Sequence, residues 1–134
     1  MTVQKISSNK IKVIRNFRDL EVWQESFQLQ LEIEELLKSY PPDEKYLLVD
    51  QMKRNCRAVP ALIVEGWARR ESVKELRNYF KNAYGECCET VNHLLLSKYK
   101  GYVKKEGYAD ELIERYEIVG MKLTKLRNNW RKFK

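Results

Sequence analysis

The chain has 134 residues, of which 43% are hydrophobic, and this is long and apolar enough for one compact domain rather than a disordered polyelectrolyte. Its net charge of +7, from 26 Lys and Arg against 19 Asp and Glu, favours an acidic partner such as nucleic acid, although basic surfaces are often only solvated. No apolar run reaches the roughly 20 residues that cross a bilayer, and the N-terminal residues lack the apolar core of a secretion signal. We therefore expect a cytoplasmic protein without a membrane partner.

The charges are unevenly distributed along the chain. Residues 1–18 hold five bases and no acid, residues 19–40 hold six acids and one base, and residues 121–134 hold six bases and no acid. Both ends are therefore basic. We treat residues 1–16 as a basic N-terminal extension and residues 17–134 as one four-helix domain, which is within the usual size of a single folding unit.

Between the prolines and glycines lie four long segments with apolar residues at helical spacing. They predict helices over about residues 17–39, 43–68, 72–100 and 109–132. The last segment is the most regular, since apolar side chains follow in steps of four and three from Leu112 to Phe133. Each segment has an apolar face, which favours an all-α fold with the helices packed as a bundle.

The first predicted helix has two opposed apolar faces. One face is formed by Leu20, Trp23, Phe27 and Leu31, and the other by Val22, Leu29, Ile33, Leu36 and Tyr40. A single helix in a small bundle cannot bury both faces without a second partner. We infer a homo-oligomer in which the second face meets a neighbouring subunit. The alternative is that the N-terminal extension of the same chain covers it.

The second predicted helix contains a proline and ends near a glycine. Pro60 cannot donate a backbone hydrogen bond, so we expect it to bend the helix. Gly66 either makes room for the close approach of another helix or allows the helix to end. Two indoles, Trp67 and Trp130, lie near basic residues, but the place of Trp130 in the apolar seam of the fourth helix favours a role in the core over stacking on bases.

Catalytic motifs find little support. The only histidine is His93, and the three cysteines, two of them adjacent, lack the spacing of a zinc site or a disulfide framework. Glu89 lies four residues before His93, and we expect a hydrogen-bonded pair on the helix surface rather than a metal site. The glycines are too scattered for a phosphate-binding loop. We therefore expect no enzyme, no cofactor and no metal; a nuclease built on Glu65 and Glu89 is the weakest alternative.

Basic residues form the stronger signal. Helical spacing places many of them away from the apolar faces, on adjoining strips that could follow a phosphate backbone. The candidate nucleic-acid-binding residues are Lys53, Arg54, Arg57, Arg69, Arg70, Lys122, Lys125, Arg127, Arg131 and Lys132. For Arg54 and Arg57 an equally good alternative is an ion pair across a subunit interface. The acids available for it on the first helix include Glu32 and Glu35.

Several motifs, in order along the chain, resemble one family. They are FRDLEVWQ at residues 17–24, YPPDEKY at 40–46, QMKR at 51–54, VPALIVEGWAR at 59–69, LLL at 94–96 and GYV at 101–103. Together they resemble the bacterial four-helix-bundle proteins encoded in intervening sequences of 23S rRNA genes. The chain departs from the family pattern at Leu62, where the family usually has Asn, and at Val64, where it usually has Ala.

The resemblance implies an up-down-up-down antiparallel four-helix bundle that assembles into a ring-like homopentamer. The family includes, or closely resembles, the accessory variability protein of diversity-generating retroelements, a basic pentamer that binds nucleic acid and a reverse transcriptase. We therefore expect a non-enzymatic, oligomeric accessory protein whose partners are RNA or an RNA–DNA hybrid and, through the resemblance, a reverse transcriptase. The alternative, suggested by the rRNA-linked members, is a protein–protein scaffold.

Overall fold

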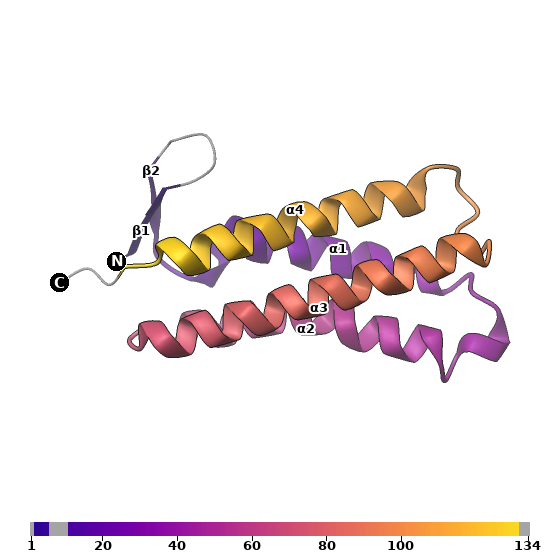
Figure 1. Ribbon diagram of the computed structural model, residues 1–134, viewed down its shortest axis with the longest axis horizontal. Coiled ribbons are helices and arrows are strands. Elements are labelled where there is room, and N and C mark those ends of the chain that lie inside the picture. The colour runs from indigo at the N-terminus through magenta and orange to yellow at the C-terminus, as the bar shows by residue number, and fades with distance from the viewer. Residues whose placement is uncertain (1, 6–10, 132–134) are drawn as a thin grey trace.

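The computed structural model describes residues 2–5 and 11–131, with side chains from residue 13 onward. Most of these residues form four helices: α1 (Glu21–Leu37), α2 (Leu48–Ala68), α3 (Val73–Tyr99) and α4 (Tyr108–Asn129) (Figure 1). Two single-turn 3-10 helices precede α1 and α2, namely η1 (Phe17–Asp19) and η2 (Pro42–Glu44). An antiparallel hairpin comes first, made of β1 (Thr2–Lys5) and β2 (Ile11–Ile14). The four expected helices are confirmed.

The first two helices begin later than the sequence pattern predicts, because a separate turn precedes each. Before α1, the side chain of Asn16 accepts from the backbone of Arg18 at 2.9 Å, and Asp19 accepts from the backbone of Asn16 at 3.2 Å. This reciprocal pair is a capping box around η1. Before α2, the fixed φ of Pro42 starts η2. As a result α1 starts at residue 21 rather than 17, and α2 at 48 rather than 43.

The hairpin is the part of the fold that helical spacing does not predict. Its strands pair from Thr2 opposite Ile14 to Lys5 opposite Ile11. Ile14 is 1% exposed and its neighbour Val13 is 44% exposed, because successive side chains of a strand point to opposite faces. The basic extension is therefore anchored to the core through Ile14.

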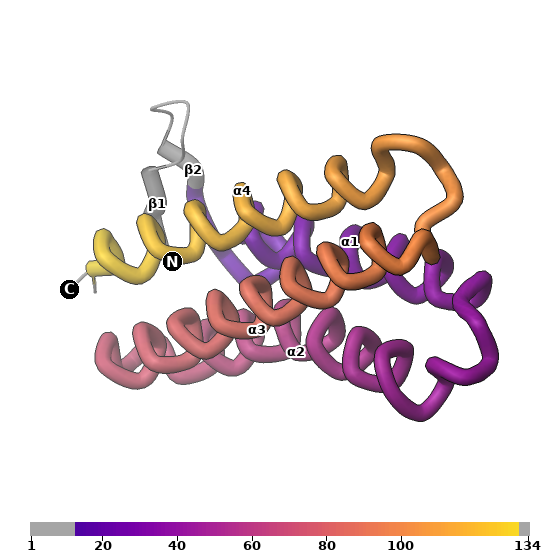
Figure 2. Tube along the Cα trace, turned by 45° about the vertical axis from the view of Figure 1, so that its right-hand side comes forward, coloured from indigo at the N-terminus to yellow at the C-terminus, as the bar shows by residue number. Residues whose placement is uncertain are grey.

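Consecutive helices run in opposite directions, and α3 and α4 lie in front of α1 and α2 in Figure 1. α2 packs against α1 and α3, α3 packs against α4, and α4 returns to α1, so the four helices enclose one core (Figure 2). The hairpin lies at the end of the bundle where α4 finishes, opposite the α1–α2 and α3–α4 loops (Figure 1). In the described ranges, no helix has the length and apolar character needed to cross a membrane.

The apolar face of the first helix that we assigned to a neighbouring subunit points toward the core of its own chain. Val22, Leu29, Ile33 and Tyr40 are each no more than 7% exposed, and Leu36 is partly buried against the same cluster. The assignment of these five residues to an oligomer interface is therefore wrong, because they pack in or against the core of their own chain. Both faces of α1 repeat at helical spacing, so the spacing did not indicate which one lies inside.

The opposite face of α1 lies at the surface. Phe27 is 40% exposed and Leu31 is 49% exposed, whereas Leu20 is buried. The ring of Trp23 stacks on that of Phe27 with centroids 4.8 Å apart, and Phe17 of η1 packs edge-on against Trp23 at 5.2 Å. We refer to Trp23, Phe27 and Leu31 as the outer α1 face. Trp23 is partly buried, whereas Phe27 and Leu31 have no cover within the described chain comparable to that of the core face.

α2 continues through Pro60 to Ala68, and Gly66 lies inside it. A Cβ added at Gly66 would lie 2.8 Å from Cε1 of Phe80 and 3.2 Å from Cβ of Tyr79, both on α3. Of the two roles expected for Gly66, the structure supports the close approach of another helix. The expected bend at Pro60 stays a prediction.

Candidate functional site

Two of the predicted nucleic-acid contacts join α1 to its neighbours. Arg57 on α2 lies 2.6 Å from Oε1 of Glu34, and its hydrogen-bonded guanidinium lowers the pKa of that carboxyl. Lys122 on α4 lies 2.8 Å from Glu25 and 3.6 Å from Glu21. A phosphate would have to displace a carboxylate to reach either base. Both residues are therefore weaker candidates than their charge suggests.

Arg69 and Arg70, which follow α2, are also engaged. The guanidinium of Arg69 lies 3.3 Å from Glu65 and 3.5 Å from Glu75. That of Arg70 lies 4.0 Å from the ring centroid of Trp67 and donates to the Trp67 carbonyl at 3.0 Å. These contacts stabilise the turn between α2 and α3.

The acids expected to reach a neighbouring subunit have partners within the chain. Arg115 on α4 lies 2.6 Å from Oε2 of Glu32, and this hydrogen-bonded guanidinium lowers the pKa of Glu32 to about 2. The hydroxyl of Tyr108 also donates to Glu32, at 3.1 Å. Glu35 pairs with Lys38 at 2.9 Å. Glu32 therefore joins α1 to α4 instead of reaching outward.

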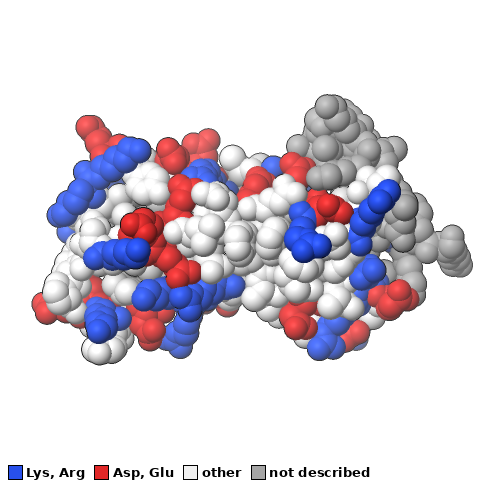
Figure 3. All heavy atoms as spheres, turned by 180° about the vertical axis from the view of Figure 1, so that it is seen from behind, with Lys and Arg blue, Asp and Glu red and all other residues white. Residues whose placement is uncertain are grey.

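The face formed by α1 and α2 carries mixed charge. Figure 3, which views the molecule from behind, shows basic and acidic side chains intermixed at both ends of this side, with uncharged surface between them. Arg54 lies 3.8 Å from Asp50, and both side chains are exposed, so their pairing contributes little stability. Lys53 is exposed. This face does not present a continuous row of cations.

One group of bases without a carboxylate partner lies on α3, near the end of α4 and directly after it. Nε of Arg77 on α3 donates to the backbone carbonyl of Arg127 on α4 at 3.1 Å. Lys81 is one turn beyond Arg77 on α3, and Arg131 follows Arg127 by four residues. We refer to the following five residues as the basic strip: Arg77, Lys81, Lys125, Arg127 and Arg131. Lys125, two residues before Arg127, lies on another side of α4 than Arg127 and Arg131. In the part of the chain that the structure describes, none of the five forms an ion pair.

The three strip residues near the end of α4 were among the predicted nucleic-acid contacts, and the two on α3 were not. The available signal was the four-residue spacing of Arg77 and Lys81 on the solvent side of an amphipathic helix. It was missed because nothing in that spacing relates α3 to the end of α4. Lys132, which we also predicted as a contact, lies outside the described residues.

Aromatic rings in the core anchor the end of α4, next to Arg127 and Arg131. Trp130 is 2% exposed and packs edge-on against Trp67 of α2 and Phe80 of α3, with centroids 6.1 Å apart in each case. The expected place of Trp130 in the core is confirmed. The guanidinium of Arg131 donates to the Trp130 carbonyl at 3.0 Å. The negative end of the α4 dipole favours cations here, so Arg127 and Arg131 lie where the helix itself stabilises positive charge.

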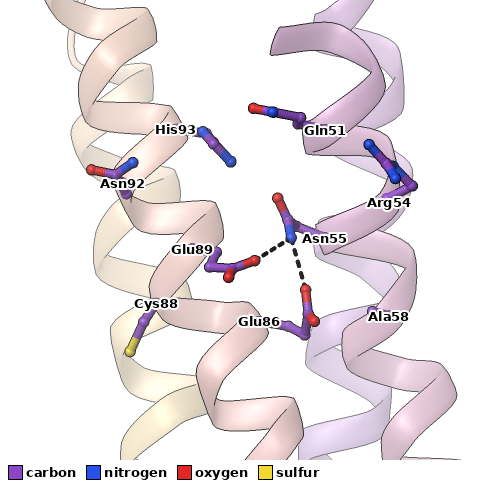
Figure 4. Close-up of a pocket in the computed structure, with 9 residues that line it drawn as sticks. All are labelled: Gln51, Arg54, Asn55, Ala58, Glu86, Cys88, Glu89, Asn92 and His93. Atoms are coloured by element: carbon purple, nitrogen blue, oxygen red, sulfur yellow. Dashed lines mark hydrogen bonds between the residues drawn. The ribbon is translucent and has the colours of Figure 1, made fainter. Parts of the chain in front are cut away.

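A polar groove of about 780 Å³ lies between α2 and α3 (Figure 4). Nδ2 of Asn55 donates to Glu86 at 2.7 Å and to Glu89 at 2.6 Å, so Glu89 pairs with Asn55 instead of the expected His93. Oδ1 of Asn55 and Nδ1 of His93 are buried without a hydrogen-bond partner. Among the residues that the structure describes, no three His, Cys, Asp or Glu side chains lie close enough to hold a metal ion. The groove therefore offers hydrogen-bonding groups.

Comparison with known families matches the helical part of the chain. The family model described as 23S rRNA-intervening sequence protein matches residues 18–125, from η1 into α4. No curated protein matches the chain. The matched range includes Arg77, Lys81 and Lys125 of the basic strip and ends before Arg127. Because the match spans well over half of the chain and the fold is the four-helix bundle expected from the resemblance, the protein belongs to the 23S rRNA-intervening sequence protein family.

Proposed function

We propose that the protein is a non-enzymatic, oligomeric accessory that binds RNA or an RNA–DNA hybrid and presents it to a partner enzyme such as a reverse transcriptase. The observation that carries this proposal is the basic strip. Its five cations lack carboxylate partners among the described residues, while Arg57, Arg69 and Lys122 are neutralised within the chain. Unpaired cations along two adjacent helices attract a phosphate backbone without reading its bases.

The number of cations in the strip predicts how steeply the nucleic-acid affinity depends on salt concentration. If all five residues of one subunit contact phosphates, the slope of log K against log salt is about −3.5 for a single strand and about −4.5 for a duplex. Affinity should therefore fall by two to three orders of magnitude, roughly, between about 50 and 200 mM salt. A weaker dependence would mean that fewer strip residues contact phosphate.

Fluorescence anisotropy with labelled RNA tests the proposal. Reversing charge on the strip with Arg77→Glu and Arg127→Glu should abolish binding at about 50 mM salt, because each substitution replaces an attraction by a repulsion. Lys53→Glu with Arg54→Glu is the matched control, since it makes the same total charge change at two exposed bases on α2, outside the strip. Equal loss in the control, or unchanged binding in the strip variant, contradicts the proposal.

We further propose that the outer α1 face meets a second copy of the chain. Large apolar side chains at the surface favour burial in an interface, and Phe27 and Leu31 remain 40% and 49% exposed in one chain. A ring-like homopentamer, as the family resemblance implies, would carry five times the +7 charge of one chain and so attract nucleic acid strongly. We propose the cytoplasm as the place of action, in keeping with three free cysteines.

A protein–protein scaffold is the second candidate function. The mixed charge of the α1–α2 side and the apolar outer α1 face would suit a protein partner as well as a second copy. The two functions differ in their dependence on nucleic acid. Binding of a purified reverse transcriptase can be measured after nuclease treatment and with the strip variant. If binding is kept in both cases, the scaffold is favoured. If binding is lost in both cases, the nucleic-acid accessory is supported.

A further inference from the structure

The loop end of the bundle exposes an unusual amount of aromatic surface. Among the large apolar side chains of the described residues, the three most exposed all lie there: Tyr99 at 86%, Tyr46 at 79% and Leu47 at 62%. Tyr46 and Leu47 connect η2 to α2, and Tyr99 is the last residue of α3. Because these three side chains bury so little surface, they contribute little to the stability of the fold.

Contacts between the loops bring these residues to one end. The hydroxyl of Tyr102, after α3, donates to Glu44 of η2 at 2.8 Å. The ring of Tyr102 also packs against Tyr40, with centroids 5.3 Å apart. Figure 1 shows both loops at the end of the bundle away from the hairpin. Residues 45–47 and 99–105 therefore border the same surface.

Lysines alternate with the tyrosines on this surface. Residues 98–105 hold four lysines and no acid. Lys98 pairs with Asp110 at 2.8 Å, but Lys104 donates only to the carbonyl of Gly101, and Lys45 lies over the ring of Tyr46 at 5.3 Å. Within the described chain, neither Lys45, Lys100 nor Lys104 forms an ion pair. We refer to Lys45, Tyr46, Tyr99, Lys100 and Lys104 as the loop-end surface.

We infer that the loop-end surface binds single-stranded nucleic acid, with unpaired bases stacked on Tyr46 and Tyr99 and phosphates held by the neighbouring lysines. Exposed aromatic rings beside unpaired cations match what a single strand offers, which is flat bases on a charged backbone. A duplex keeps its bases stacked inside, so only its phosphates could contact this surface, through the lysines. This inference rests on the proposed function and adds to it a second surface that is selective for single strands.

The loop-end surface is separate from the basic strip. α3 has 27 residues, so its two ends are about 40 Å apart, with the strip near its start and Tyr99 at its end. A membrane surface would also attract lysines and aromatic rings. However, membrane binding through an interface calls for a broad apolar face, and Leu47 is the only aliphatic side chain more than half exposed in residues 45–47 and 99–105.

Anisotropy with a single strand of about 15 nucleotides and a duplex of the same length tests the inference. Tyr46→Ala and Tyr99→Ala should each lower the single-strand affinity about tenfold and leave the duplex affinity within about twofold. Tyr46→Phe and Tyr99→Phe should retain binding, because stacking requires the ring and not the hydroxyl. Met121→Ala, at a residue 60% exposed on α4, controls for loss of exposed apolar surface in general.

The outcomes separate this inference from the function on which it rests. If wild-type protein binds neither strand form at about 50 mM salt, both fail. If it binds both forms and the alanine variants bind single strands normally, the proposed function stands and the loop-end inference is overturned. The loop-end inference is also overturned if the alanine variants lose duplex and single-strand affinity equally. It is overturned as well if they bind both strand forms normally and lose only their binding to anionic lipid vesicles in a flotation assay. Selective loss of single-strand binding, with retention in the phenylalanine variants, supports it.

Discussion

Replacing Gly66 with Ala tests the close packing of α2 on α3. The added Cβ would lie 2.8 and 2.9 Å from two ring carbons of Phe80, which is 1% exposed and packs against Trp130. Overpacking in a core costs about 1–3 kcal/mol, whereas Gly→Ala inside a helix stabilises it by about 1 kcal/mol. Subtracting the second effect from the first, we expect Gly66→Ala to lower the free energy of unfolding by about 1 kcal/mol.

Gly85→Ala is the matched control, since Gly85 lies inside α3 and no neighbouring atom would come within 4 Å of the added Cβ. It should raise the free energy of unfolding by about 1 kcal/mol. Urea denaturation of both variants, at one protein concentration because assembly contributes to stability, gives the comparison. If Gly66→Ala stabilises the protein as much as Gly85→Ala does, the argument for close helix packing at Gly66 is refuted.

Three further predictions follow from contacts at α1 and from burial. The ion pair of Glu32 with Arg115, which lowers the pKa of Glu32 from 4.5 to about 2, contributes stability that is present above about pH 4.5 and is lost as the pH falls toward 2. The difference in unfolding free energy between wild type and Glu32→Gln should therefore shrink over that range, and a constant difference would contradict it. Phe27→Ser with Leu31→Ser should lower the solution mass measured by light scattering while the helical circular dichroism is kept; an unchanged mass would rule out the outer α1 face as the interface. Under native conditions Cys88, which is exposed, should react with a thiol reagent far faster than the other two thiols, and three equal rates would contradict the burial. Burial raises the pKa to about 12 for both Cys56 and Cys87.

Helical spacing was sufficient for the four helices and for the core place of Trp130. An apolar side chain every third or fourth residue is a local property, and it puts those side chains on one side of a helix whatever surrounds it. The first residues of the helices were less predictable, because the capping box of Asn16 with Asp19 delays the start of α1 and the turn at Pro42 delays that of α2. The hairpin was not predicted because its strands have only four residues each, too short for a clear alternation of apolar and polar side chains.

The amino-acid sequence by itself determined the number of helices, the basic balance and the positions of the charges. Only the tertiary structure decided which apolar face of α1 is buried, since Ile33 and Phe27 are both large and apolar, yet Ile33 is 0% exposed and Phe27 is 40% exposed. The same holds for the basic strip. Arg77 and Arg127 meet because α3 and α4 pack side by side, and Arg57 is neutralised because α1 brings Glu34 to it. Whether a charge is available to a partner depends on the distance to the nearest opposite charge, and packing between helices sets that distance.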